Sequence, residues 1–567
     1  MRAGRPLIIA LMLASPAAGD TVPAPASEIS AVGPGRNIGL YAAQTFRLAD
    51  GRCQDCATIR QALWYFERET IAVPRSGLPV AAFTPGVRAV DDVRAWAAAR
   101  APGALLDYPP LVWVAAPQVA ANARLTPDAT TLTFAGHTQV PFRLAPKIPL
   151  NRSYFDGSSA IFFSQRPIKV RGTLDEGQIV ARTLWPEDFR LDPAPPRQAL
   201  AADLPPAEAL RARVRALPQG GAQSPFAAST LWQRSGTSES PPVSPGRPVI
   251  GIMVNGAQGD DDEAHGGHFA LITGRTQADG AIGDWLVNNF YSLDVESEKG
   301  ILAAPLPLDD YLADLNSGQG YYRPSYMIVA VLRDERAPAL LQSALNRVYN
   351  QFYRHQLVYQ HATMNCASIS VDVMRALGWD VPARGATSRL LGAVGFPYFL
   401  ATERSLAKAK TAYDYLVVDQ TRLMPAAAFE EAGASLLSLV GATGTRVSRS
   451  KANGRLAQML AEDVETIAFV RFPQFPSSRA FGNAPAVTTW EYKALVPADP
   501  AEAQIVAVPS RPFPDKLRDP DLLPPPRRPS DTAAMVWAVL ALGGIPWLGW
   551  RLWQRWRRRK AGGATHG

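Results

Sequence analysis

Short runs of alternating apolar and polar residues between turn residues fill about residues 80–190 of the chain. A strand has a side-chain period of two, so this pattern predicts a small β-rich domain. We expect its strands at 111–116, 131–136, 160–165, 168–172 and 178–185. Before this region, apolar residues at helical spacing within 53–72 predict a helix after the cysteine pair.

A second region with strong apolar periodicity begins near residue 248 and predicts strands first and helices afterwards. We expect strands at 249–255, 268–275, 284–293 and 325–332, with a last strand at 465–472. We expect helices at 207–216, 338–359, 366–377 and 406–437. Gly378 ends the third of these helices, and Pro425 interrupts the fourth.

The two ends of the chain resemble targeting and membrane segments. Arg2 and Arg5 precede a short apolar run, and Ala17-Ala18-Gly19 offers a cleavage site, which is typical of a secretory signal. Residues 533–550 are almost wholly apolar and are followed by a cluster of arginines. This pattern predicts a transmembrane helix with a cytoplasmic C-terminus and a large domain outside the cytoplasm.

The net charge of +8 comes from these ends. Arg2 and Arg5 supply two units, and six basic residues after Trp550 supply the rest, so residues 20–550 are neutral overall. Binding to nucleic acid requires a basic surface on the folded domain. We therefore expect no nucleic-acid partner.

Proline-rich stretches divide the chain into expected segments. They are a signal peptide (1–19), an N-terminal segment with a CQDC pair and helix (20–80), a β-rich domain (81–191), a Pro-rich linker (192–247), a catalytic domain (248–425), a C-terminal α/β extension (426–508), a Pro-rich juxtamembrane spacer (509–531), a transmembrane helix (532–553) and a basic cytoplasmic tail (554–567).

The chain has three cysteines, and two of them stand close together as Cys53 and Cys56. In an exported protein such a pair is most simply a disulfide, although a redox role stays open. Further ligands for zinc are not nearby, so we expect no metal and no cofactor. Cys366 remains as an odd thiol.

Cys366 follows Asn365, a favoured N-cap residue, so the cysteine should lie in the first turn of a helix. Unpaired backbone N–H groups and the helix dipole stabilise a thiolate there. The same N–H groups, next to the Asn365 cap, are suited to holding an oxyanion. Cys366 is therefore a candidate nucleophile, and a buried core cysteine is the alternative.

His268 opens a strongly alternating strand directly after Gly266 and Gly267. In this position it is a candidate base for the thiol proton, as nucleophilic catalysis requires. The next predicted strand carries Asn288 and Asn289 within an apolar run. Buried amides need partners, so either asparagine is a candidate for the third, orienting residue. A turn near Asp279-Gly280 would join the two strands as a hairpin.

The strand GHFALI, the strand VNNFYS and the helix start NCASISVDV, with tyrosines upstream of it, resemble the circularly permuted papain-like proteins of the NlpC-type superfamily. The closest resemblance is to the periplasmic domain of Lnb-type lipoprotein N-acyltransferases, over roughly residues 248–380. It implies that Cys366 is the nucleophile, that His268 is its base, and that Asn288 or Asn289 orients the base.

With this resemblance, the expected fold class is α+β. It comprises a permuted papain-like domain, in which an antiparallel sheet packs with a cysteine-bearing helix, a β-rich N-terminal domain and one C-terminal transmembrane helix. The expected protein is a periplasmic, single-pass inner-membrane enzyme that acts on acyl groups of lipids or lipoproteins beside the lipid bilayer. The alternatives are a cell-wall peptide amidase and a non-catalytic membrane-tethered binding or assembly module.

Overall fold

The computed structural model describes the folded body of the chain, with gaps. The described residues are 29–31, 37–54, 56, 60–77, 89–101, 104, 106–107, 109–134, 139–146, 155–216, 225–235, 243–256, 266–293, 301–385, 388–442, 454–476, 486–495 and 511–517. The expected signal peptide (1–19), the apolar segment 532–553 and the basic tail (554–567) lie outside these residues.

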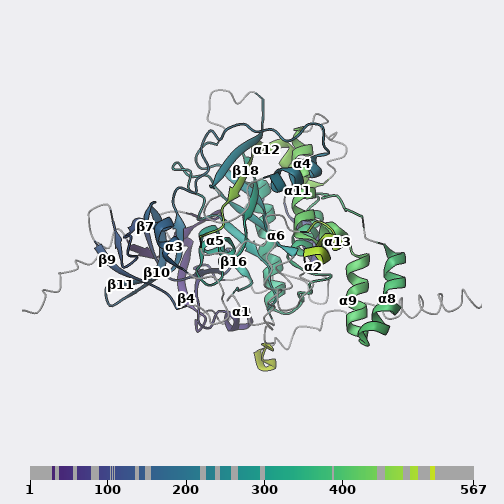
Figure 1. Cartoon of the computed structure of the whole chain (residues 1–567), viewed down its shortest axis with the longest axis horizontal. Helices are drawn as coiled ribbons and strands as arrows, with labels where there is room; N and C mark the ends of the chain where they lie inside the picture. Colours follow the sequence, from purple (N-terminus) through teal and green to yellow (C-terminus); the bar gives the residue numbers. More distant parts are fainter. Residues whose placement is uncertain are drawn as a thin grey trace, which may run out of the picture.

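A seven-stranded antiparallel sheet forms the centre of the molecule, in the order β12-β18-β17-β13-β14-β15-β16 (Figure 1). Its strands are β12 (Ala227–Gln233), β13 (Pro248–Asn255), β14 (His268–Arg275), β15 (Leu286–Asn289), β16 (Ala304–Pro307), β17 (Ser325–Leu332) and β18 (Val464–Phe472). Strands β13 and β17 are buried along their whole length. Helices or other strands therefore cover both faces, which is why these strands are apolar without a polar side.

Helices pack on this sheet and on one another. Helices α6 (Arg336–Tyr353), α7 (Cys366–Ala376) and α11 (Pro425–Val440) pack against β13 or β14. Helices α4 (Pro206–Ala216) and α12 (Arg455–Asp463) pack on α11, and the short α10 (Gln420–Leu423) packs on α7 and α11. The sheet thus includes β12 from the expected linker and β18 from the expected C-terminal extension, so it extends across both of those boundaries.

The N-terminal part is rich in short strands and lies beside the central sheet (Figure 1, purple and blue). One sheet has six strands, β1 (Ile29–Ala31), β7 (Gln118–Leu125), β8 (Thr131–Thr133), β9 (Gln139–Leu144), β10 (Ile168–Asp175) and β11 (Gln178–Pro186). A second has three, β4 (Phe46–Asp50), β5 (Thr70–Pro74) and β6 (Val112–Ala115), and β2 (Asn37–Ile38) pairs with β3 (Tyr41–Ala42). One apolar core runs from this region into the central sheet.

Two local predictions in the N-terminal part were wrong. The run expected as a strand at 160–165 belongs to helix α3 (Gly157–Ser164), because the Asp156 side chain caps the helix by accepting from Ser159 N at 2.9 Å. The helix expected after the cysteine pair is present as α1 (Arg60–Tyr65) but ends early, since residues 70–74, within the stretch expected to be helical, pair as β5 between β4 and β6. Helix α2 (Ala89–Ala99) was not expected.

The predicted fold class was wrong in its transmembrane component. Among the described residues, no helix combines the length and the apolar character that crossing a bilayer requires. The stretch 532–553, to which the transmembrane helix was assigned, is outside those residues. The fold that positions the site is α+β, and none of its described helices is a membrane span.

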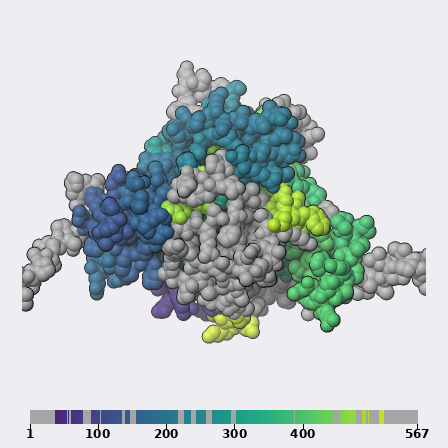
Figure 2. All heavy atoms as spheres, viewed as in Figure 1, coloured from purple at the N-terminus to yellow at the C-terminus, as the bar shows by residue number. Residues whose placement is uncertain are grey.

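Helices α8 (Arg389–Glu403) and α9 (Leu406–Val417) form a hairpin that stands at the edge of the molecule (Figure 1, right, green). The two helices pack mainly on each other. They share a small apolar cluster around Phe396 and Ala409 that is separate from the main core. Helix α13 (Thr489–Leu495) is coloured yellow-green beside the hairpin in the space-filling view (Figure 2).

Candidate functional site

The start of helix α7 is held by a capping box. The Asn365 Oδ1 accepts from Ser368 N at 2.9 Å, and Ser368 Oγ accepts from Asn365 N at 2.7 Å. The Asn365 amide nitrogen donates to the carbonyl oxygens of His361 and Leu423, both at 2.9 Å. Asn365 therefore serves as the cap, and its own N–H groups are committed to carbonyls. Oxyanion stabilisation then depends on backbone N–H groups.

Cys366 is the first residue of α7, and its thiol is not in a disulfide. Its side chain is buried. The first N–H groups of a helix have no intrahelical acceptor, and the positive end of the helix dipole is located there. A thiolate on Cys366 gains from both effects, which is the environment found for reactive cysteines.

His268 is the first residue of β14, and its side chain is only 4 % exposed. It pairs across the sheet with Asn255 of β13. Gly267, directly before it, has φ +77°, a left-handed conformation that favours glycine. This turn brings the chain sharply into β14 and sets the position of the imidazole. Helix α7 packs against the same strand.

The register of the hairpin distinguishes the two candidate asparagines. Leu271 of β14 pairs with Asn288 of β15, so Ala270 stands opposite Asn289. Side chains alternate along a strand, so Asn289 is on the face of His268 and Asn288 is on the other face. Asn288 exchanges two hydrogen bonds of 3.0 Å with Gln342 of α6, which occupies its amide.

Asn289 is therefore the asparagine that the fold places with the imidazole. Its amide nitrogen donates to Leu302 O at 3.1 Å, which orients the side chain. Within the described part of the chain, neither His268 Nε2 nor Asn289 Oδ1 has a partner in ordinary hydrogen-bond geometry. The Asn289 side chain nevertheless raises the pKa of His268, because it favours the protonated imidazole.

Tyr311 and Arg323 also belong to this site, and sequence patterns did not identify either. The ring centroids of Tyr311 and His268 are 6.2 Å apart, and the Tyr311 hydroxyl donates to Asn255 Oδ1. Burial raises the pKa of Tyr311 well above its usual range, the charge of Arg323 opposes this, and the charge of Cys366 adds to it. Tyr311 is thus within electrostatic range of Cys366 and in ring contact with His268.

Burial and then the positive charge of Arg323 lower the pKa of His268 to about 3, and Asn289 acts in the opposite direction. The imidazole is accordingly neutral at pH 7, and it has a lone pair to accept a proton. Arg323 itself is buried and donates to Gln319 Oε1 at 2.8 Å. The neutral imidazole can accept a proton, and its low pKa makes it a weaker base than an ordinary histidine.

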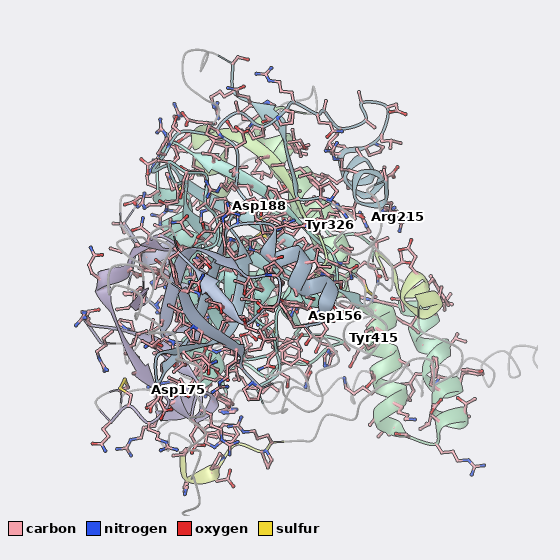
Figure 3. All side chains as sticks on the ribbon, turned by 60° about the vertical axis from the view of Figure 1, so that its left-hand side comes forward. Asp156, Asp175, Asp188, Arg215, Tyr326 and Tyr415 are labelled. Atoms are coloured by element: carbon pink, nitrogen blue, oxygen red, sulfur yellow. A yellow bond between two sulfur atoms is a disulfide. The ribbon has the colours of Figure 1, made fainter. Side chains whose placement is uncertain are left out.

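A cavity of about 620 Å³ adjoins Cys366. Gly266 and Gly267 line it just before His268, and His268 itself is not among the lining residues. One wall comes from the α8–α9 hairpin, including Tyr415 near the end of α9 that is closest to the body (Figure 3). Apolar and aromatic side chains dominate the lining. They are Tyr359, Phe399, Tyr415, Leu416, Leu423 and Met424.

Buried ion pairs fasten helix α5 (Leu308–Ala313), which carries Tyr311, to the N-terminal sheet. Arg171 of β10 donates to both oxygens of Asp309, at 3.0 and 3.2 Å, and Lys169 is 2.7 Å from the same carboxylate. Burial alone would raise the pKa of Asp309, but the two cations outweigh it and lower the pKa. The β-rich region thereby positions the element that contacts His268.

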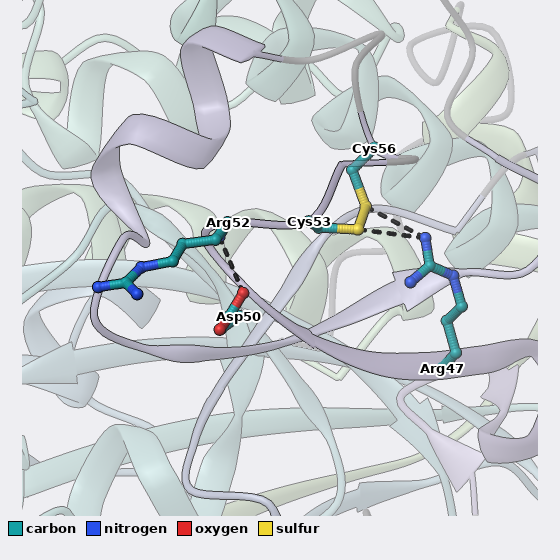
Figure 4. The surroundings of a disulfide bond; sticks show 5 residues. All are labelled: Arg47, Asp50, Arg52, Cys53 and Cys56. Atoms are coloured by element: carbon teal, nitrogen blue, oxygen red, sulfur yellow. Dashed lines mark hydrogen bonds between the residues drawn. A yellow bond between two sulfur atoms is a disulfide. The ribbon is translucent and has the colours of Figure 1, made fainter.

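Cys53 and Cys56 form a disulfide in the loop after β4 (Figure 4). The Arg47 guanidinium donates to the sulfur atoms of Cys53 and Cys56 at 3.3 and 3.2 Å. Sulfur is a weak acceptor, so these contacts orient the arginine over the bridge more than they stabilise it. The disulfide is distant in sequence from the residues around Cys366.

No group of three or more His, Cys, Asp or Glu side chains that could hold a metal ion occurs in the part of the chain that the structure describes. Comparisons with models of known protein families, with curated protein sequences and with solved structures found no match.

Proposed function

We propose that this protein is a cysteine-dependent acyl-transfer enzyme, with Cys366 as the nucleophile and His268 as its base. The observation that carries the proposal is the position of Cys366, at the N-terminus of α7 and in the wall of a cavity of about 620 Å³. A thiol in the wall of a cavity can be reached by a substrate, as a nucleophile must be. Asn289 is the orienting residue, because it shares the face of His268.

In the proposed reaction, the Cys366 thiol gives its proton to the neutral His268 imidazole as sulfur attacks an acyl carbonyl carbon. Backbone N–H groups at the start of α7 stabilise the resulting oxyanion. The carbonyl then re-forms, the bond to the leaving alcohol or amine breaks, and the imidazolium protonates that group. Water or an amine next attacks the thioester while His268 takes its proton, which releases the acyl product and restores the thiol.

The lining of the cavity favours an acyl chain over a peptide. Aromatic and aliphatic side chains from α8, α9, α10 and the start of α11 surround the space in front of Cys366. Burying an aliphatic chain against these side chains releases water from apolar surface, which favours binding. We therefore propose lipid or lipoprotein acyl groups as the substrate class, ahead of cell-wall peptides.

The disulfide supports an oxidising compartment. Disulfides persist in secreted and periplasmic proteins and are rare in the cytosol. We propose the bacterial periplasm as the location of the described body. Thiol counting on the unreduced, denatured protein should find one free thiol, and reduction should raise the number to three.

The test of the chemistry is intact-mass analysis of the full chain after incubation with phospholipid and, separately, with a muropeptide. We expect an acyl adduct from phospholipid that maps to Cys366. Cys366→Ala should form no adduct. Ser370→Ala is the matched control, because this residue is buried in the same helix one turn later.

The outcomes test the nucleophile and distinguish a lipid substrate, a cell-wall peptide substrate and a binding module. An adduct of equal yield on Cys366→Ala would refute the nucleophile. An adduct that forms only with the muropeptide would replace lipid by cell-wall peptide as the substrate. Absence of an adduct on the wild type with both donors, in protein that carries the disulfide and unfolds cooperatively, would favour a binding module.

A further inference from the structure

Helix α8 exposes a continuous apolar face. Leu390, Val394 and Tyr398 are 72, 57 and 63 % exposed, and they follow one another at intervals of four residues. Residues three or four apart are neighbours on one side of a helix, so the three side chains form a stripe. Leu391 and Leu400 of α8 and Leu406 at the start of α9 are also exposed.

The sequence of α8 does not resemble an ordinary surface helix. Residues 390–402 contain no charged side chain, although only Gly392 and Phe396 of the helix are buried. A helix that is apolar on most sides is normally covered by protein or by lipid. An exposed apolar patch of this kind marks an interaction site.

The inner side of the same hairpin is the wall of the Cys366 cavity. Lining residues extend along α9 from Leu416 to Lys408, and Glu403 of α8 lines the cavity at the turn. With a rise of 1.5 Å per residue, this wall is about 12 Å long. Glu403 and Lys408 are exposed and 2.9 Å apart, so the cavity reaches the surface at the hairpin turn, next to the exposed Leu406.

The charges around the stripe suit a lipid surface with anionic headgroups. Arg389 and Arg404 are at the two ends of α8, and both are exposed. Neither has an ion-pair partner among the residues that the structure describes. Basic residues that border an apolar face are typical of helices in the plane of a membrane interface. The exposed Trp490 of α13 follows Thr489, another cavity residue, and indole side chains favour this interface.

We infer that the α8–α9 hairpin docks on the surface of a lipid bilayer and passes an acyl chain from the bilayer into the Cys366 cavity. The occupant of the apolar face is lipid, because the exposed Arg389 and Arg404 border this face and the same hairpin forms one wall of the mainly apolar Cys366 cavity. The docking is peripheral, since α8 has 15 residues and is too short to cross a membrane. The acyl-delivery part of this inference rests on the proposed function, whereas the docking part does not.

The docking test uses depth-dependent fluorescence quenching on the full chain. Tyr398→Cys, in a Cys366→Ala background, is labelled with an environment-sensitive maleimide dye and mixed with phosphatidylcholine–phosphatidylglycerol vesicles containing a doxyl-labelled lipid. We expect a blue shift and strong quenching. Ile161→Cys is the matched control, because Ile161 is 58 % exposed on α3, at the other side of the molecule in Figure 1, and should be affected by neither.

Two results would overturn the docking inference. The first is equal quenching at positions 398 and 161, or none at 398. The second is a blue shift at 398 that grows with protein concentration without vesicles, which would show that a second copy of the chain covers the stripe. Because the probe reports its own position, any other contact of the chain with lipid does not affect the comparison.

The delivery test compares two acyl donors in protein that retains Cys366. The triple variant Leu390→Ser/Val394→Ser/Tyr398→Ser should acylate Cys366 from phospholipid in vesicles at about one tenth of the wild-type rate or below. Its rate with soluble p-nitrophenyl butyrate should equal that of the wild type. Ile161→Ser is the control and should change neither rate.

The outcomes separate the two proposals. A triple variant that loses both donors equally, or neither, would refute delivery through the hairpin. Wild-type protein that accepts neither of these donors would refute lipid acyl groups as the proposed substrate class, and the quenching pattern would still decide whether the hairpin docks on lipid.

Discussion

The lowered pKa of His268 predicts a specific dependence of stability on pH. The ordinary pKa of 6.5, expected in the unfolded chain, falls to about 3 in the fold because the imidazole is buried and near Arg323. Between these two values the unfolded state binds a proton that the folded state does not. Stability is therefore unaffected by His268 above pH 6.5 and decreases as the pH falls from 6.5 towards 3.

The magnitude follows from the same two values. At pH 5 the unfolded imidazole is almost fully protonated and the folded one is neutral, so His268 destabilises the fold by about 2 kcal/mol relative to pH 7.5. His268→Gln removes the titration and leaves the other ionisable groups in place. Lowering the pH from 7.5 to 5.0 should thus cost the variant about 2 kcal/mol less than the wild type.

Urea unfolding at the two pH values, followed by tryptophan fluorescence and circular dichroism, measures this difference. Trp285 and Trp379 are buried and report on the central sheet and on the end of α7. The comparison applies where the two signals give one coincident transition. Ser370→Ala changes no ionisable group, so its free energy of unfolding should fall by the same amount as that of the wild type between the two pH values. Equal losses for wild type and His268→Gln would refute the idea that His268 is buried in its neutral form.

Three further predictions follow from the site and its support. Asn289→Ala should lower the pKa of His268 further and shift the pH profile of Cys366 acylation. Asn288→Ala should leave the profile unchanged and destabilise the protein by about 1–3 kcal/mol in urea titrations, because it removes two buried hydrogen bonds to Gln342. Asp309→Asn should lower the free energy of unfolding by about 1.5–3 kcal/mol, since Lys169 and Arg171 lose a buried carboxylate that they share and keep only Asp284 and Asp310. The exposed pair of Asp175 serves as the control, and equal midpoint shifts would contradict this expectation. Tyr311→Phe should lower the free energy of unfolding, measured by calorimetry, by about 1–3 kcal/mol, because Asn255 loses the hydroxyl that donates to it. An unchanged melting temperature would show that this hydrogen bond does not stabilise the fold.

Features that depend on neighbouring residues could be predicted from the sequence. Asn365 caps α7, so the position of Cys366 in the first turn followed from two adjacent residues. The alternation in β14 and the turn near Gly280 likewise predicted that β14 pairs with β15. These signals are local because capping and turn conformations involve only a few residues along the chain.

The tertiary structure decided the rest. The choice between Asn288 and Asn289 depends on the register of β14 on β15, and a shift of one residue would exchange their faces. The run at 160–165 became a helix because Asp156 caps it, against its strand-like composition. Tyr311 contacts His268 only because buried ion pairs hold α5 in place. The Cys366 cavity likewise requires the α8–α9 hairpin, which forms one of its walls. The sequence alone does not distinguish the apolar residues of this hairpin from core residues. Only the folded chain shows that several of them are exposed.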